Sequence, residues 1–147
     1  MGEIRTKVWL TNAVDEALAS LGKLAADQVR RMEVDAVVDT GAVSPVLPVH
    51  VVDQLGLLTR GNRVAQMADG RNEVVGVTGP VVFEIQTRNT IEEALILGDE
   101  VLIGQTVLEK LDLFADCTNQ RLVPNPAHPD QPVLKVRRRW TLHQDET

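Results

Sequence analysis

The sequence predicts a mainly β domain, arranged as a sandwich or barrel, with one or two short helices. The sequence contains many short segments in which apolar residues either alternate with polar ones or follow one another directly. Each segment ends near Gly, Pro, Asn or Asp, as strands do. Apolar residues at helical spacing occur in only a few short segments. The length of 147 residues suits one domain with its own hydrophobic core.

The first half of the chain predicts two strands and two segments of helical character. Gly22 interrupts the first helical pattern, so we expect a loop or a short helix there. Pro45 and Pro48 break regular structure, and the helix after Pro48 ends at Gly56. The segments are a strand at 6–12, a loop or short helix at 13–26, a strand at 31–39 and a short helix at 48–57.

The second half predicts a hairpin, three strands, a helix and a last hairpin. Asp69-Gly70 lies between the apolar runs 63–68 and 72–77, which is a strong hairpin pattern. Strands follow at 81–87, 93–97 and 100–103, then a helix at 105–113 and a hairpin at 114–123. We expect a domain over 1–125, then a proline-rich linker and basic tail over 126–147 that could pair as an edge strand.

Composition excludes several classes of function. The net charge is −6 and aromatic residues are few, which argues against nucleic-acid binding. No apolar run approaches the ~20 residues of a membrane span, and the N-terminus has no signal-peptide pattern, so we expect a cytoplasmic protein. The three histidines lack ligand spacing, so no metal or cofactor is expected. The single Cys117 cannot form an internal disulfide and is expected to be a small buried residue.

Two heptapeptides form a faint internal repeat. VDQLGLL at 52–58 and LEKLDLF at 108–114 have corresponding apolar and polar positions, and each follows a strand and a short helix. Chance could produce so short a match, and so could duplication of a half-domain.

The most informative stretch is VDAVVDTGAVSPVLP at 34–48, which places an acid at the end of an apolar strand. Burying an unpaired carboxylate is costly, so the group must shift its pKa or find a partner. Two readings of Asp39 follow: a carboxylate that caps nearby amides in an ordinary turn, or a carboxylate kept for chemistry.

The stretch resembles the active-site motif of retropepsin-like aspartic proteases. VVDTGA is followed by Leu47-Pro48, and VLIGQTVLEKL supplies the second marker of that family, two apolar residues and a glycine before a helix. The order of predicted elements matches over roughly residues 4–125. The resemblance implies a closed β-barrel or sandwich that forms one half of a two-fold dimer.

The resemblance also implies the chemistry. An aspartic endopeptidase uses two carboxylates about 3 Å apart that share one proton and activate a water. This chain has one Asp-Thr-Gly motif, so the second carboxylate would be Asp39 of a second subunit in a homodimer. The expected substrate is an extended peptide or protein segment, and no cofactor is needed.

The other candidate residues take their roles from the same resemblance. Thr40, Gly41 and Ala42 would form the active-site loop, and Ile103 and Gly104 would support it from below. Ala68, Asp69 and Gly70 would form the tip of a flap over the substrate, although a plain hairpin turn explains Asp69-Gly70 equally well.

Two alternatives stay open at this stage. A non-catalytic module on the same dimeric fold would bind peptides or proteins without cutting them. A phosphotransferase with an aspartate nucleophile would need further acids and a lysine around Mg²⁺ on an α/β scaffold, which the mainly β pattern disfavours.

Overall fold

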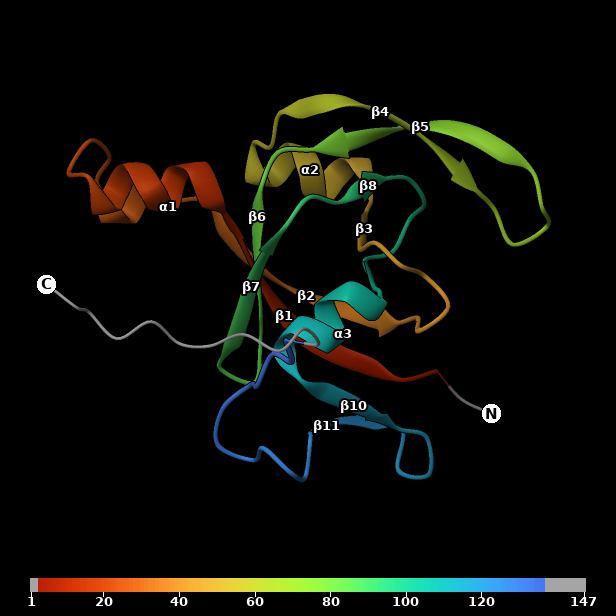
Figure 1. Ribbon diagram of the computed structural model, residues 1–147. Coiled ribbons are helices and arrows are strands. Elements are labelled where there is room, and N and C mark those ends of the chain that lie inside the picture. Colours follow the sequence, from red (N-terminus) through yellow and green to blue (C-terminus); the bar gives the residue numbers. More distant parts are fainter. Residues whose placement is uncertain (1–2, 137–147) are drawn as a thin grey trace, which may run out of the picture.

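The computed structural model describes residues 3–136 and is mainly β (Figure 1). The strands are β1 (Arg5–Asn12), β2 (Arg31–Val38), β3 (Val46–Leu47), β4 (Thr59–Gln66), β5 (Asn72–Thr78), β6 (Val81–Ile85), β7 (Arg88–Glu92), β8 (Leu95–Ile96), β9 (Leu102–Ile103), β10 (Leu113–Asp116) and β11 (Arg121–Pro124). The helices are α1 (Ala13–Ser20), α2 (Val49–Leu55) and α3 (Gln105–Leu111), with a 3₁₀ turn at Ala26–Gln28.

Within residues 3–136, nine strands form one curled sheet, in the order β4-β5-β8-β3-β9-β2-β1-β6-β7. β2 lies inside the sheet, antiparallel to β1 and parallel to β9. β10 and β11 form a separate two-stranded sheet below α3 (Figure 1). This arrangement confirms the predicted mainly β architecture.

The core lies between the curled sheet and the short helices. Its largest fully buried side chains come from β1, β6, α2, α3 and the short strands β3 and β9, and they include Leu10, Phe83, Leu47, Leu55 and Leu111. Burying one such side chain contributes roughly 1.5–3 kcal/mol. A few bulky side chains therefore fix both helices against the sheet, although each helix is only seven residues long.

The internal repeat appears as two similarly built helix ends. α2 and α3 are equally long, and each ends at a residue in the left-handed conformation, Gly56 (φ 62°, ψ 32°) and Asp112 (φ 56°, ψ 46°). At each helix end, a side chain from a strand donates a hydrogen bond to the last carbonyl groups of the helix. Asn12 Nδ2 contacts Leu55 O at 2.9 Å, and Arg88 Nη1 contacts Leu111 O at 2.9 Å. The two halves thus share a local design.

Several sequence-based predictions are confirmed, with changed boundaries. The hairpin across Asp69-Gly70 forms, but β4 begins at Thr59, earlier than expected. Residues 13–26 contain the short helix α1, for which the Asn12 side chain accepts the Val14 and Asp15 amides. The last hairpin also forms, as β10 and β11. The helix predicted over 105–113 ends at Leu111.

Other predictions are wrong. The strand expected at 93–97 is reduced to β8, and the preceding segment forms β7, which we did not predict. The described part of the chain contains three α-helices rather than one or two. Cys117 is exposed rather than buried, because it lies in the turn between β10 and β11. Residues 133–136 are not in a strand, and the rest of the expected edge strand lies outside the described residues.

Across residues 3–136, none of the helices has the length and apolar character needed to span a bilayer.

Candidate active site

Asp39 lies directly after β2, where the central strand meets β9. The parallel pairing of Val38 with Ile103 continues for one more residue, since the Asp39 amide donates to Ile103 O at 2.9 Å. Val37 N donates to Val101 O at 2.9 Å on the same ladder. The backbone of Asp39 is therefore fixed by the sheet, while its side chain is half-buried at the edge of the core.

The Asp39 carboxylate closes a tight turn over the next residues. Its Oδ1 accepts the Gly41 amide at 3.0 Å, and its carbonyl accepts the Ala42 amide at 3.1 Å. A Cβ at position 41 would lie 3.3 Å from Oδ1, which is tighter than an ordinary contact. Gly41 thus lets the backbone pass close to the carboxylate. Oδ2 accepts no hydrogen bond from residues 3–136.

The loop after Asp39 rests on the start of α3. The Gln105 amide donates to Ala42 O at 2.7 Å, and the Thr106 amide donates to Val43 O at 3.1 Å. A Cβ at Gly104 would lie 2.7–3.0 Å from the carbonyl oxygens of Ala42, Val43 and Ser44. Only glycine permits this approach without a backbone shift. Ile103 is fully buried beneath the loop. The predicted supporting residues are therefore in direct contact with the predicted active-site loop.

Sequence reasoning missed a row of apolar residues beside Asp39. The strand registers align Val37 with Leu102, Leu102 with Val46, and Val46 with Leu95 across four strands. Paired residues of neighbouring strands project from the same face of a sheet. Val37 and Val46 are buried, at 9% and 7% exposure, and Leu95 and Leu102 are half-buried. The row is adjacent to Asp39, which lies two residues beyond Val37.

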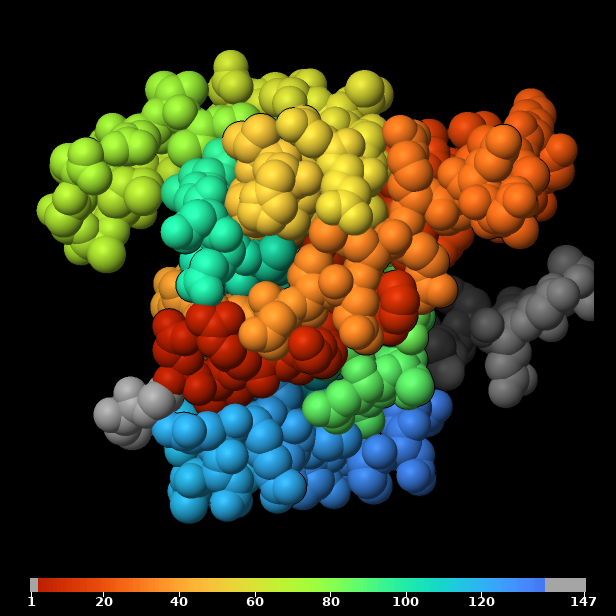
Figure 2. All heavy atoms as spheres, turned by 180° about the vertical axis from the view of Figure 1, so that it is seen from behind, coloured from red at the N-terminus to blue at the C-terminus, as the bar shows by residue number. Residues whose placement is uncertain are grey.

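The β4–β5 hairpin arches over the side where the loop after Asp39 lies (Figure 1). Seen from behind, it extends well beyond the body of the molecule (Figure 2). Met67 and Arg71 close its tip through a 2.7 Å hydrogen bond, and Gly70 adopts φ +87°. The tip, including Ala68, Asp69 and Gly70, is exposed.

Asp69 has a local structural role in this tip. Its carboxylate accepts the Arg71 amide at 3.0 Å and Arg71 Nε at 2.7 Å. These bonds, the amide's first, hold the pKa of Asp69 below its usual range. Asp69 thus stabilises the turn, and no contact joins it to Asp39 within the described part of the chain. Thr40, next to Asp39, is exposed.

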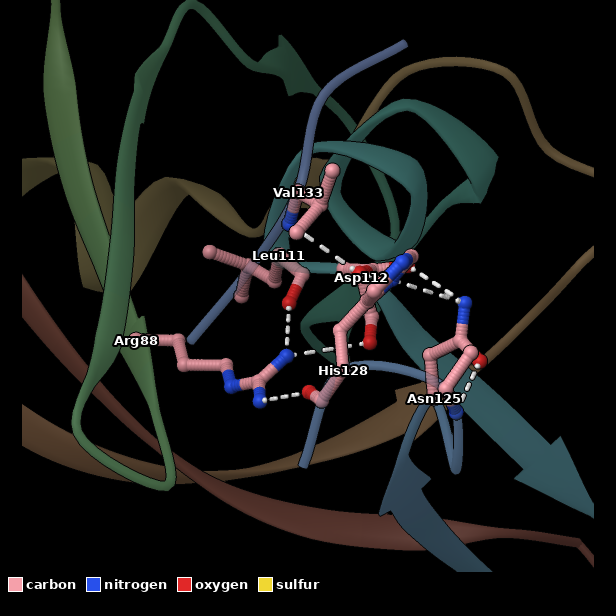
Figure 3. Close-up of polar contacts among 7 residues, drawn as sticks. Arg88, Leu111, Asp112, Asn125, His128 and Val133 are labelled. Carbon is pink, nitrogen blue, oxygen red and sulfur yellow. Dashed lines mark hydrogen bonds and ion pairs between the residues drawn. The ribbon is translucent and has the colours of Figure 1, made fainter. Parts of the chain in front are cut away.

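A second polar cluster was also missed, and it lies around Asp112 (Figure 3). The internal repeat held a signal for it, because it aligns the charged Asp112 with Gly56, the left-handed residue that ends α2. A charged residue at a position that favours glycine indicates a use for its side chain.

Comparison with solved structures places this fold among the retropepsin-like proteases. The retroviral protease-like domain of Ddi1 from Leishmania major superposes with a TM-score of 0.52 at 12% identity, covering 86% of this chain and 90% of that one. EIAV protease complexed with the inhibitor HBY-793 has a TM-score of 0.48 at 18% identity, covering 74% and 86%. A retropepsin-like aspartic protease from Rickettsia conorii has a TM-score of 0.45 at 15% identity, covering 79% and 89%.

No protein-family model matches the sequence, and no curated protein is similar to it in sequence. At such low identity the structural likeness shows the fold alone. The chain therefore has a retropepsin-like fold, and its activity has to be argued from the residues of the site.

Proposed function

We propose that the chain is an aspartic endopeptidase that acts as a homodimer through a pair of Asp39 carboxylates. The observation that carries the proposal is the construction of the Asp39 loop. A carboxylate with one open oxygen stands at the end of a central strand, and Gly104 and α3 hold the loop in place.

The proposed chemistry requires a second carboxylate. One ionised Asp39 takes a proton from water as the water attacks the peptide carbonyl, and its protonated mate donates to the carbonyl oxygen. Two acids about 3 Å apart share one proton because both cannot ionise together. A two-fold axis beside Thr40 would supply the mate, since an isologous contact brings each residue near the axis against its own copy.

The apolar row beside Asp39 supports a peptide as the substrate. An extended peptide places alternate side chains on one face, so apolar side chains of the substrate would meet the half-buried Leu95 and Leu102. The flap would cover the peptide from the other side and exclude water. We therefore expect cleavage next to apolar residues.

The test compares Asp39→Asn with the wild type on a diverse peptide pool, read by mass spectrometry from pH 4 to pH 7. Loss of the acid–base group should reduce cleavage by at least about 100-fold. Asp53→Asn is the matched control, because Asp53 is an exposed aspartate on α2. Its cleavage should equal that of the wild type, and circular dichroism should show both variants folded.

Two results would contradict the proposal. Cleavage by Asp39→Asn at the wild-type rate would refute the proposed mechanism with two Asp39 carboxylates. A wild-type protein that binds peptides from the pool without cutting any would instead support a binding module on the same fold.

A further inference from the structure

The apolar row beside Asp39 continues onto one face of the β4–β5 hairpin. Leu95 of β8 pairs with Val77 of β5, and Val77 pairs with Gly61 of β4. Paired residues project from the same face of a sheet, so this face of the hairpin is continuous with the row. Val77 is 4% exposed, and Val75, two residues nearer the tip, is 8% exposed. We call the face of β4 and β5 that bears Val75 and Val77 the row face.

Arg63 projects from the row face, because it pairs with Val75 across the hairpin. The other face of the hairpin carries Val64 and Val74, which pair with each other and are 67% and 72% exposed. The hairpin arches over the side where the loop after Asp39 lies (Figure 1). A positively charged side chain therefore lies on the face of the hairpin that would cover a peptide bound beside Asp39.

Arg63 forms no ion pair with residues 3–136, whereas the charged residues around it are paired. Glu73 lies on the same face and is held by Arg71, whose Nη1 is 3.1 Å from Glu73 Oε1. Glu93 accepts hydrogen bonds from two nitrogens of Arg60. These bonds are the main reason that the pKa of Glu93 lies below its usual range, and the Arg63 charge contributes least. Both nearby carboxylates thus already have an arginine partner.

We propose that Arg63 binds a carboxylate of the substrate, so that the peptide cleaved at Asp39 carries an aspartate or glutamate within a few residues of the cleaved bond. The inference rests on the proposed function, because it requires the hairpin to close over a peptide. Closure removes water from the row face, and a charge that loses water without gaining a partner is costly. The substrate therefore has to supply the opposite charge.

The row and Arg63 together define a pattern in the substrate. An extended peptide presents every second side chain to one face. The acidic residue therefore lies an even number of positions from an apolar residue that contacts the half-buried Leu95 or Leu102. A guanidinium binds a carboxylate through two parallel hydrogen bonds, which a neutral amide cannot replace. In a homodimer each subunit carries its own Arg63, so the acidic residue is expected on either side of the cleaved bond.

The test first finds the preferred acidic position in the diverse peptide pool, and then compares peptides with amidated C-termini that carry glutamate, glutamine or lysine at this position. The wild type should cleave the glutamate peptide with a kcat/KM at least about tenfold above that of the glutamine peptide. Arg63→Gln should lower this ratio to about one, and Arg63→Glu should favour the lysine peptide, a reversal that a damaged fold cannot produce. Arg121→Gln is the matched control, because Arg121 is an exposed arginine in the separate β10–β11 sheet, and it should keep the wild-type ratio.

A binding measurement makes the test independent of cleavage. Labelled peptides are titrated with Asp39→Asn, and fluorescence anisotropy gives the dissociation constants. The glutamate peptide should bind at least about tenfold more tightly than the glutamine peptide. Adding Arg63→Glu to the same chain should reverse the order of the glutamate and lysine peptides.

The outcomes separate this inference from the proposed function. Cleavage of the pool without any acidic preference overturns the inference and leaves the proposed function intact. A glutamate preference that Arg63→Gln and Arg63→Glu both retain overturns the role of Arg63. A wild type that binds glutamate peptides without cutting them, and loses this preference in Arg63→Glu, supports the inference and contradicts the proposed function. A protein that neither binds nor cuts any peptide overturns both.

Discussion

The Gly104→Ala variant tests whether the contact with Gly104 and α3 fixes the position of the loop after Asp39. The added methyl would lie 2.7 Å from Ala42 O, 2.9 Å from Ser44 O and 3.0 Å from Val43 O. All three atoms are backbone, so none can rotate away as a side chain can. To regain an ordinary contact of 3.4 Å, the Ala42 carbonyl would have to move by roughly 0.7 Å.

The expected loss of stability follows from three terms. Overpacking a tight site costs about 1–3 kcal/mol. Displacing the Ala42 carbonyl also weakens its 2.7 Å bond from the Gln105 amide, which costs about 1 kcal/mol. Replacing glycine by alanine returns about 0.4–1 kcal/mol by restricting the unfolded chain. We therefore expect the free energy of unfolding to fall by about 2 kcal/mol.

Urea unfolding followed by circular dichroism measures this change, with Gly61→Ala as the control. Position 61 has no atom within 4 Å of an added Cβ, so its free energy of unfolding should change by less than about 0.5 kcal/mol. Under the proposed function, a shift of this size in the loop should also slow cleavage by tens-fold to 100-fold. Equal unfolding midpoints for Gly104→Ala and Gly61→Ala would refute the support of the loop by α3.

Two further predictions concern the ends of the helices. Asn12→Ala removes the cap of α1 and leaves Leu55 O without its donor, so the free energy of unfolding should fall by about 2–3 kcal/mol. Urea unfolding measures this change, with Asn72→Ala at an exposed position as the control. A loss below 0.5 kcal/mol would contradict this role. The pKa of Asp112 is held below its usual value, mainly by the hydrogen bond from Asn125. The ionised Asp112 carboxylate therefore contributes to stability above about pH 4, and this contribution disappears as the pH falls further. The stability difference between wild type and Asp112→Asn should accordingly shrink between pH 5 and pH 2.5, and a difference independent of pH would exclude the linkage.

The sequence predicted the local structure around Asp39 because its determinants are local. The apolar run before Asp39 specifies a buried strand, and Gly41 and Gly104 mark the places where backbone approaches closely. The contact between Gly104 and the loop joins residues 60 positions apart, yet each partner carries its own local pattern. The resemblance to a known motif then related the two patterns to one site.

β7 could not be predicted in the same way, because tertiary context determines it. Its sequence, RNTIE, has one large apolar residue, Ile91, which is 55% exposed. The strand forms because it pairs along all five residues with β6, in which every side chain except that of Glu84 is buried. Alternation of apolar and polar residues indicates a strand that buries one of its faces. An edge strand with mostly polar residues lacks this alternation, so it cannot be recognised in this way.

Sequence reasoning missed the polar cluster around Asp112 for a different reason. Its members, Arg88, Asp112, Asn125 and His128, lie far apart in the sequence, and none belongs to a recognisable motif. The internal repeat nevertheless isolates Asp112, because glycine ends the first helix of the pair where aspartate ends the second. Holding a residue with a Cβ at positive φ costs about 1 kcal/mol, so a side chain there must return more than it costs. Asp112 does so through three hydrogen bonds to the chain after β11. The residue that ends α3 therefore differs from the one that ends α2 because it attaches the chain after β11 to the domain.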